Sequence, residues 1–331
     1  MTAFILRRLL IMVPTLIAIS MISFFIIQLP PGDYLTHLVA QMEETGDEMS
    51  TEVVEQLRRQ YGLDQPVYVQ YWWWITGMVR GDLGQSLIYQ KPVTTLIWER
   101  LGLTVAISAL TLILTWAIAI PIGIYSAVRQ YTFFDYLFTL IGFVGMATPA
   151  FALALILMYF AYRYMGISVG GLFSPEFIST PWSWARVIDL LKHIWIPVVV
   201  LAVGSTAGMI RTMRANLLDE LEMPYVVTAR AKGMSPLRLL IKYPVRLAIN
   251  PVVSTIGWML PWLISGSVIV AHVLSLPTTG PLLLKALYYQ DMYLAGSFVM
   301  MLSVLTVIGT LMSDILLAWV DPRIRFESGR T

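Results

Sequence analysis

Long stretches without a charged residue alternate with short charged segments along the whole chain. A helix needs about 20 residues to cross the roughly 30 Å of hydrocarbon in a bilayer. A charged side chain at its centre costs about 3 kcal/mol, so a charge-free stretch of this length predicts a membrane-spanning helix. Six stretches qualify: 9–32, 101–128, 136–162, 193–210, 247–284 and 292–313. We therefore expect an all-α integral membrane protein with six transmembrane helices.

The fifth stretch is too long for one helix and carries Pro277, Gly280 and Pro281 near its end. We expect one span over 251–273, followed by an irregular segment over 275–281. Non-helical backbone at membrane depth is tolerated only where it is buried in protein or lines a wet cavity. The segment is therefore either a gate or cavity wall, or an external loop that happens to be apolar.

The first stretch follows Arg7 and Arg8, an arrangement that also begins secretory signal peptides. Its charge-free length exceeds the roughly 7 to 15 residues of a signal-peptide core. No small-residue cleavage pattern follows at 28–32. We therefore expect a retained first helix.

The distribution of basic residues predicts which side of the membrane each segment faces. Six spans put both termini on one side. Cytoplasmic termini place thirteen Lys and Arg residues inside, against four in the short outer loops. Cytoplasmic loops carry the excess of positive charge in membrane proteins. We expect the N- and C-termini and the loop 212–250 in the cytoplasm, and the segment 33–100 outside.

The outer segment, 33–100, is expected to be a folded insertion with interfacial helices. Residues 50–62 carry a capping residue, early acids, late bases and a terminal glycine, as a helix does. A charge-free helix over 65–79 carries four consecutive aromatic residues, 71–74, which favour the headgroup level of a membrane. The alternative is an aromatic platform that stacks on a sugar ring or a peptide side chain. A further helix is expected to run from Pro92 into the second span.

The inner segment, 216–250, carries signals for two short helices. The first is expected to start at Pro224 and to end at a tight turn on Gly233. The second is expected to start at Ser235-Pro236 and to continue through Arg246.

Seven basic residues lie in or just before this inner segment, between 211 and 246. A basic helical pair on the cytoplasmic side could lie on anionic lipid or dock into a groove of a partner protein. Ala229, Ala231 and Gly233 favour docking, because small residues let another protein's backbone approach closely.

Residues 225–235 resemble the cytoplasmic coupling loop of binding-protein-dependent ABC importer permeases, specifically of the dipeptide, oligopeptide and nickel branch. The segment reads Tyr-Val-Val-Thr-Ala-Arg-Ala-Lys-Gly-Met-Ser. Other stretches that are similar to this family lie at 7–10, 31–33, 61–66, 81–86, 314 and 319–324. The resemblance implies an ATPase-coupling role for Tyr225, Thr228, Ala229, Arg230, Ala231, Lys232, Gly233 and Ser235.

The resemblance also implies a type I importer permease (MetI-like) fold with six helices. The N-terminal segment and first helix would occupy 1–32, and the external insertion would occupy 33–100. A core of five helices, which includes the coupling loop 212–250, would occupy 101–331. The implied partners are a second homologous permease subunit, two cytosolic ATP-binding subunits and an external solute-binding protein. The chain would bind no cofactor, with ATP and Mg²⁺ held by the partner subunits, and would lie in the inner membrane of a prokaryote.

Composition excludes several other classes of protein. With 57% hydrophobic and 13% charged residues, the chain cannot be an ordinary soluble domain, since those carry about 25% charged residues. A net charge of +2 argues against nucleic-acid binding, and the absence of cysteine removes disulfides and thiolate metal sites. Three scattered histidines do not indicate a catalytic or metal site. No Gly-Lys pair occurs, so the chain lacks the usual phosphate-binding loop and is not expected to be an enzyme.

Prolines within the spans indicate where a translocation pathway could run. Pro149 and Pro261 interrupt backbone hydrogen bonding in mid-span, and such positions often line a cavity. The candidate pathway residues are Thr148, Pro149, Trp258, Ser265, Ser267 and His272. Core packing is the alternative role for the tryptophans. The small residues of 204–208 predict close helix packing, either inside the chain or against another subunit.

We therefore expect the permease subunit of an ATP-driven importer for a small oligomeric solute, either an oligopeptide or dipeptide or an oligosaccharide. Where the family often has an acidic residue before the outer turn, this chain has Ala271 and His272, which suits an uncharged substrate. One alternative is an ion-coupled secondary transporter without ATPase partners, which would place ionisable residues inside its spans. The six stretches are free of charge, with Asp314 near the end of the last. A membrane scaffold without a transport role is the third possibility.

Overall fold

The structure is a computed structural model that describes residues 2–46, 50–166, 170–255, 262 and 268–320. Helices make up most of these residues, and the only strand-like pairing found among them is an isolated bridge between Gln85 and Pro92. Contacts divide the chain into two compact units. Helices α5 (Val93–Val128) and α16 (Met292–Val320) each contribute one part to each unit.

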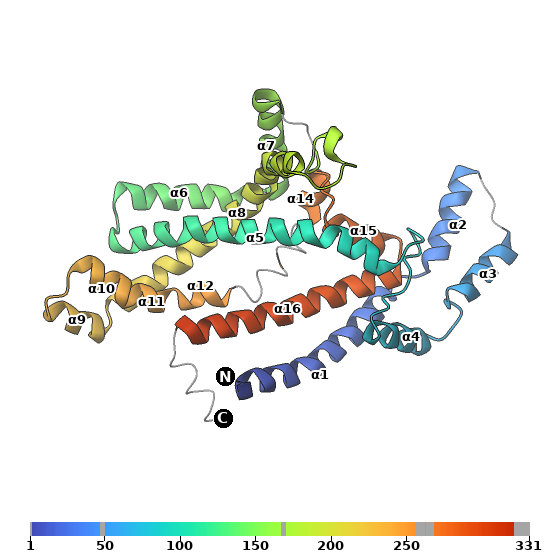
Figure 1. Cartoon of the computed structure of the whole chain (residues 1–331), viewed down its shortest axis with the longest axis horizontal. Coiled ribbons are helices and arrows are strands. Elements are labelled where there is room, and N and C mark those ends of the chain that lie inside the picture. Colours follow the sequence, from blue (N-terminus) through green and yellow to red (C-terminus); the bar gives the residue numbers. More distant parts are fainter. Residues whose placement is uncertain (1, 47–49, 167–169, 256–261, 263–267, 321–331) are drawn as a thin grey trace. The chain divides into compact units, whose positions relative to one another are not determined.

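The first unit, the bundle, comprises Met1–Ile5, Leu103–Pro277 and Thr306–Thr331. Besides its parts of α5 and α16, it contains α6 (Phe133–Ala147), α7 (Ala150–Met165), η1 (Pro175–Phe177), α8 (Trp184–Leu221), α9 (Pro224–Ala231), α10 (Pro236–Lys242), α11 (Pro244–Ala248), α12 (Asn250–Ser254) and α14 (Val268–Val273) (Figure 1).

The second unit, the insertion unit, comprises Leu6–Gly102 and Thr278–Leu305. It contains α1 (Thr2–Ile27) from Leu6 onward, α2 (Tyr34–Thr45), α3 (Thr51–Gln60), α4 (Val67–Val79) and α15 (Thr279–Tyr288), with the start of α5 and the start of α16.

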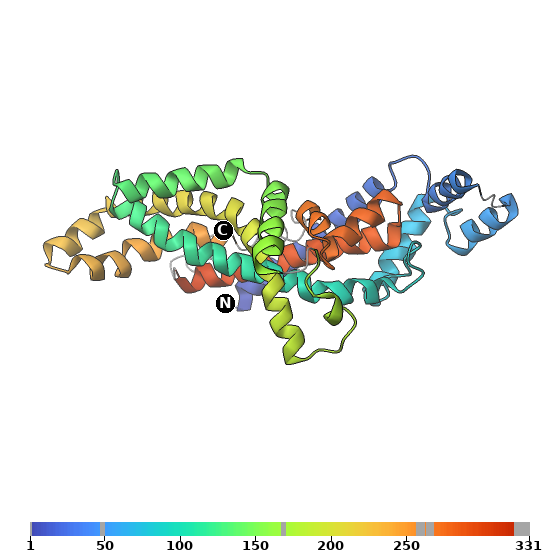
Figure 2. The same ribbon diagram turned by 90° about the horizontal axis from the view of Figure 1, so that it is seen from above.

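Four helices of the described chain, α1, α5, α8 and α16, are long and apolar enough to cross a membrane, and the pair α6 and α7 is a fifth candidate. The sequence predicted one continuous span over 136–162, which is wrong in its middle. The two helices are bent by 101° at Thr148 and Pro149, and α7 turns away from α6 in Figure 2. Thr148 is extended, with φ −81° and ψ 120°, because the residue before a proline is pushed out of the helical region. The predicted span over 251–273 falls partly outside the described residues, which omit 256–261 and 263–267.

Helix α8 is the element around which the bundle packs, and it lies against α6, α7, α11 and α12 (Figure 1). Small residues on its neighbours permit close approach. A Cβ on Gly145 of α6 would lie 2.8 Å from Val203 Cγ1, and a Cβ on Gly123 of α5 would lie 2.7 Å from Met213 Cβ. Because real Cβ contacts are longer than this, both glycines are needed for the observed helix spacing.

Aromatic packing holds α1, α4 and α16 together in the insertion unit. The buried rings of Phe24 and Trp74 have centroids 5.5 Å apart. A Cβ on Gly296 would lie only 3.0 Å from the Trp74 ring, so α16 approaches this ring closely. Trp72 and Trp73 remain largely exposed. The predicted aromatic helix therefore divides its rings: Trp74 belongs to the core, while Trp72 and Trp73 are available to the membrane interface or to a ligand.

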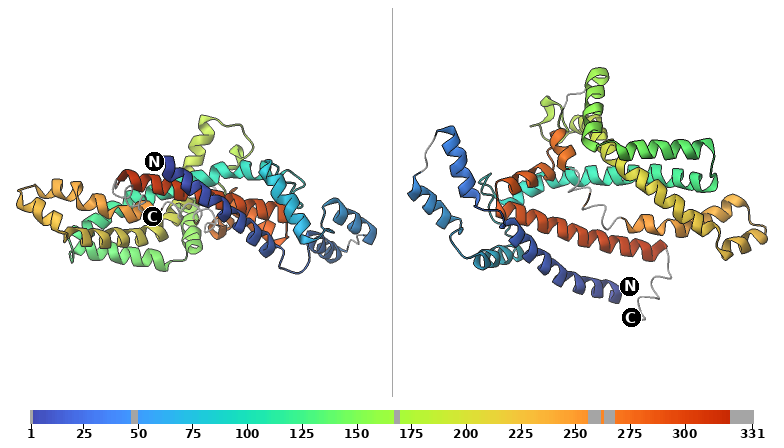
Figure 3. Two further views of the ribbon diagram at one scale, coloured as in Figure 1. Left: turned by 90° about the horizontal axis from the view of Figure 1, so that it is seen from below. Right: turned by 180° about the vertical axis from the view of Figure 1, so that it is seen from behind.

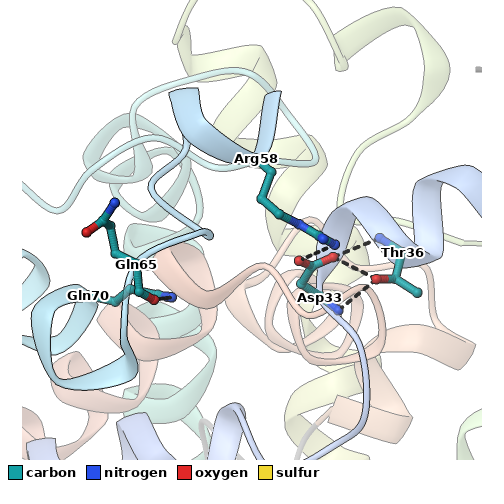
Figure 4. A network of polar contacts seen from close by, with 5 residues as sticks. All are labelled: Asp33, Thr36, Arg58, Gln65 and Gln70. Atoms are coloured by element: carbon teal, nitrogen blue, oxygen red, sulfur yellow. Dashed lines mark hydrogen bonds and ion pairs between the residues drawn. The ribbon is translucent and has the colours of Figure 1, made fainter. Parts of the chain in front are cut away.

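Polar side chains fix the short helices of this unit (Figure 4). Asp33 accepts hydrogen bonds from the backbone N–H of Thr36 at 2.9 Å and from its hydroxyl at 2.8 Å, which caps α2. The guanidinium of Arg58, on α3, lies 2.9 Å from the same carboxylate. The Gln70 amide donates to the Gln65 backbone oxygen at 2.7 Å, at the start of α4. These bonds join α2 to α3 and close the turn before α4.

The helices expected in the outer segment are present as α3, α4 and the start of α5. Helix α3 follows Ser50, whose side chain makes no capping hydrogen bond, and the chain leaves it through Gly62 at φ +67°. Helix α5 starts directly after Pro92 and continues to Val128. Helix α2 was not among the predicted elements, although Asp33 and Thr36 form a capping box that could have indicated it.

A buried carboxylate holds the loop before α5 onto the start of α16. Asp291 is fully buried, and its Oδ2 accepts hydrogen bonds from the Ser86 hydroxyl at 2.5 Å and from the Ile88 backbone N–H at 3.2 Å. Its Oδ1 accepts from the Leu294 backbone N–H at 3.2 Å. Burial raises the pKa of Asp291 and outweighs these hydrogen bonds, which lower it.

Asp291→Ala is expected to destabilise the protein by about 2–4 kcal/mol, because buried donors lose their acceptor. The raised pKa gives the pH dependence. The stability contributed by Asp291 is full below the unfolded-state pKa of about 3.9 and declines as the pH rises through the folded-state pKa. Thermal unfolding at about pH 5 and about pH 8 should therefore show the larger deficit of the variant at the lower pH.

Asp64→Ala is the matched control, because Asp64 is an exposed carboxylate in the same unit. It should change stability by less than about 0.5 kcal/mol at either pH. An Asp291→Ala deficit that grows toward alkaline pH would contradict the assigned direction of the pKa shift.

Candidate functional site

The chain after α8 forms two short helices joined by a tight turn, which lie at the far end of α8 (Figure 3). Helix α9 has Pro224 at its first position and ends at Ala231. Gly233 follows at φ +76°, a region that glycine adopts without strain, and its N–H donates to the Arg230 oxygen at 3.0 Å. Helix α10 then starts at Pro236. The turn and both helix starts are those predicted from the sequence.

A small core fixes α9 on α10, and a hydrogen bond links α9 to the end of α8. Val226 of α9 and Leu239 of α10 are buried together, and the rings of Tyr225 and Tyr243 lie 6.3 Å apart at its edge. The Tyr225 hydroxyl donates to the carboxylate of Glu220, on the last turn of α8. This hydrogen bond links the first turn of α9 to the last turn of α8.

The structure separates the predicted coupling residues by exposure. Tyr225 is half-buried, and Ala229 is buried in the contact between α9 and α10. The small side chain of Ala229 thus packs inside the loop. The exposed residues are Thr228, Arg230, Ala231, Lys232, Gly233 and Ser235.

A groove of about 520 Å³ lies beside α10. Its walls are mainly apolar, with Leu237 and Leu240 on one side and Val128 on the other, and Arg230 lines it as well. The predicted helix through Arg246 is wrong as a single element. Helix α10 ends at Lys242 and α11 starts at Pro244, because proline restricts the residue before it.

A cavity of about 690 Å³, called here the large cavity, lies where α6 and α7 meet the middle of α8. Thr148 and Pro149, at the bend, form part of its wall. The Thr148 hydroxyl donates to the Val144 oxygen at 2.8 Å, so the bend satisfies one of its own carbonyl groups. Two pathway residues predicted from the sequence are therefore brought to one cavity.

The wall of this cavity is apolar, with a few hydroxyl groups and no charged side chain among its described residues. Ser205, Thr212 and Thr255 supply hydroxyls, and Trp262 supplies an aromatic ring. The Ser205 hydroxyl lies 3.1 Å from that of Thr115 on α5. Such a wall suits uncharged groups, since nothing on it neutralises a charge.

Gly204 and Gly208 of α8 also line the cavity, a role that the sequence did not reveal. A Cβ at either position would have no atom within 4 Å in the described part of the chain. Ala207, between them in sequence, packs against α6, where a Cβ on Gly142 would lie 3.4 Å away. The small-residue pattern thus combines helix packing at Ala207 with an open wall at the two glycines.

Of the four remaining pathway residues, the structure describes His272. Trp258, Ser265 and Ser267 lie outside the described residues. His272 is an exposed residue of α14 and does not line the cavity. A second histidine, His193, is buried on α8, with Nδ1 2.7 Å from the Asp189 backbone oxygen.

The irregular segment predicted over 275–281 is shorter than expected. Helix α15 begins at Thr279, so Gly280 and Pro281 belong to its first turn, where a proline is tolerated. Leu276 is buried, and its N–H donates to the Ala271 oxygen at 2.8 Å. Both roles predicted for this segment, a gate or cavity wall and an apolar external loop, stay predictions.

Comparison with known proteins covers nearly the whole chain. A family model described as the inner membrane component of binding-protein-dependent transport systems matches residues 119–326, and the model of the corresponding N-terminal region matches residues 1–108. The oligopeptide transport system permease protein AppB of Bacillus subtilis is 37% identical over 328 residues, covering 98% of this chain and 100% of the relative. The dipeptide transport system permease protein DppB of Alkalihalophilus pseudofirmus is 28% identical over 340 residues, covering 98% and 100%.

Proposed function

The chain belongs to the family of inner membrane components of binding-protein-dependent transport systems, and from that premise we propose that it carries short peptides into the cell as one permease subunit of an ATP-driven importer. Such permeases are multi-pass inner membrane proteins and not themselves enzymes. The observation that carries the proposal is the match to this family over both parts of the chain. The two relatives are named as oligopeptide and dipeptide permeases, which supports a peptide as the substrate proposed for this chain.

The proposed complex contains a second homologous permease subunit, two cytosolic ATP-binding subunits and an external solute-binding protein. ATP and Mg²⁺ belong to the cytosolic subunits. The proposed topology has six spans, formed by α1, α5, the pair α6 and α7, α8, the segment 251–273 and α16. Both termini and the loop 212–250 then face the cytoplasm, with thirteen basic residues on that side.

Coupling is proposed to run through α9. When the ATP-binding subunits close, they displace the exposed surface around Gly233. The small core of Val226 and Leu239, together with the bond from Tyr225 to Glu220, passes this displacement to α8. Helix α8 forms one wall of the cavity, so its movement switches the side from which the cavity is reached.

Deleting the genes of the cytosolic ATP-binding subunits tests the class of transporter. Peptide uptake by cells that retain this chain should fall to background, because the six charge-free stretches hold no carboxylate that could bind a coupling ion. Uptake that persists and follows a proton or sodium gradient would identify an ion-coupled secondary transporter. If deleting the gene of this chain leaves peptide uptake unchanged, the chain has no role in transport.

An oligosaccharide is the second candidate substrate, favoured by the exposed rings of Trp72 and Trp73, since sugar rings stack on aromatic faces. A thermal-shift screen of the proposed external solute-binding protein distinguishes the two. Di- to pentapeptides with apolar side chains should raise its unfolding temperature. A shift with oligosaccharides and none with peptides would replace the peptide by a sugar.

A further inference from the structure

A second groove lies on the bundle where α6 and α8 pack side by side. It has a volume of about 230 Å³ and is separate from the large cavity, with which it shares no lining residue. Its floor is the close contact of Gly142 with Ala207, and its wall includes the rings of Phe138 and Phe143. Two basic side chains of α8, Arg211 and Arg214, complete it. The groove thus combines an apolar trough with a positively charged end.

The charge at this end exceeds what the protein itself neutralises. Arg214 Nη2 lies 3.3 Å from Asp135 Oδ2 of α6, while its buried Nε has no hydrogen-bond partner in the described chain. Arg211 is exposed, and no described carboxylate lies within salt-bridge distance of it. Its guanidinium lies over the Phe143 ring, 5.2 Å from the centroid. The groove therefore carries about one uncompensated positive charge, presented by a planar donor that suits phosphate oxygens.

The position of the groove along α8 matches the membrane interface. Arg211 is the first charged residue after the charge-free stretch 193–210. Phe134, Ile141 and Phe143 of α6 expose apolar side chains beside it. An arginine at the end of a span, next to exposed apolar side chains, meets lipid headgroups while its neighbours meet acyl chains.

We propose that this groove binds one anionic phospholipid, with its phosphate at Arg211 and Arg214 and an acyl chain along Phe138 and Phe143. Charge complementarity selects the headgroup, and the apolar trough distinguishes a lipid from a soluble phosphate. The proposal requires only that α8 crosses the membrane. Its failure would therefore leave the ATP-driven transport role intact, and failure of that role would leave the lipid site intact.

Native mass spectrometry of the purified complex tests the site with phosphatidylglycerol and phosphatidylcholine as probes. The intact protein should bind phosphatidylglycerol about tenfold more tightly than phosphatidylcholine, as one charge-assisted pair provides. Arg211→Gln should remove most of this preference. Arg163→Gln is the matched control, because Arg163 is an exposed arginine at the end of α7 and outside the groove. Equal binding of the two lipids by the intact protein, or an equal loss in both variants, would overturn the proposal.

A second variant separates a defined site from diffuse attraction to anionic lipid. Thr139 is exposed and lines the groove, so Thr139→Trp should fill the groove and reduce the preference without changing any charge. Full retention of the preference in this variant would overturn the site.

Because the chain has no cysteine, Thr139→Cys and the control Ile141→Cys give single labelling positions on α6. Phosphatidylglycerol in the bilayer should slow maleimide labelling at position 139 and not at 141. Protection of position 139 in phosphatidylcholine as well would show that a protein subunit covers the groove, which also overturns the proposal.

Discussion

Gly233→Trp is expected to reduce peptide uptake about tenfold or more while the variant still inserts into the membrane and the complex still hydrolyses ATP. The turn between α9 and α10 depends on the left-handed conformation of Gly233, at φ +76°. A residue with a Cβ costs roughly 1 kcal/mol or more there. The fold tolerates such a cost, but the substitution reshapes the exposed surface that we propose meets the ATP-binding subunits. Coupling between two sites is typically about 1–3 kcal/mol, so its loss corresponds to this reduction in uptake.

Gly166→Trp is the matched control for this variant. Gly166 is also a helix cap with positive φ, +65°, and a Cβ at either glycine has open space around it in the described chain. The two variants therefore carry the same kind of backbone strain at opposite ends of the bundle. Uptake and ATP hydrolysis by reconstituted complex, measured together, give the result. Gly233→Trp with normal uptake, or Gly166→Trp with the same loss, would remove the coupling role from the turn.

Gly204→Trp is expected to abolish uptake by filling the large cavity, with a fold at least as stable as that of the intact protein. A Cβ at this position meets no described atom within 4 Å, and the indole ring would extend into the cavity of about 690 Å³. Replacing a helical glycine also removes a conformational penalty of about 1 kcal/mol. The variant should therefore purify normally and hydrolyse ATP, yet transport no peptide.

Gly204→Ala is the control for Gly204→Trp, because it also replaces the helical glycine but adds only one methyl group. It should retain uptake within about twofold, since the cavity keeps most of its volume. Normal uptake by Gly204→Trp, with the protein intact in the membrane, would show that the peptide does not pass this cavity. Equal losses in both variants would trace the effect to the helix and not to the cavity.

The distribution of charged residues and the positions of proline and glycine predicted much of this architecture. The start of α9 at Pro224, the turn on Gly233 and the start of α10 at Pro236 could be predicted from the sequence, because proline and glycine restrict or free the backbone locally. The bend between α6 and α7 could be predicted only in part. Pro149 indicated a break, yet the 101° angle depends on how α7 packs against α8 and α14.

Tertiary packing determined what the sequence could not. Ala229 and Trp74 stood in patterns that suggested exposed roles, and burial against neighbouring helices gives both a packing role. Gly204 and Gly208 carried a helix-packing pattern but line a cavity, since their environment depends on where α6 bends. Asp291 had no local signal at all. Its partner Ser86 lies more than two hundred residues earlier in the chain.

The central claim is that this chain transports peptides only when partner subunits hydrolyse ATP. The most direct measurement is accumulation of a labelled peptide in proteoliposomes that contain the purified complex and the external binding protein. With ATP inside the compartment that the coupling loop faces, accumulation should proceed and should be insensitive to a protonophore. It should stop with a non-hydrolysable ATP analogue. Accumulation that needs no ATP and collapses when the ion gradient is removed would contradict the claim.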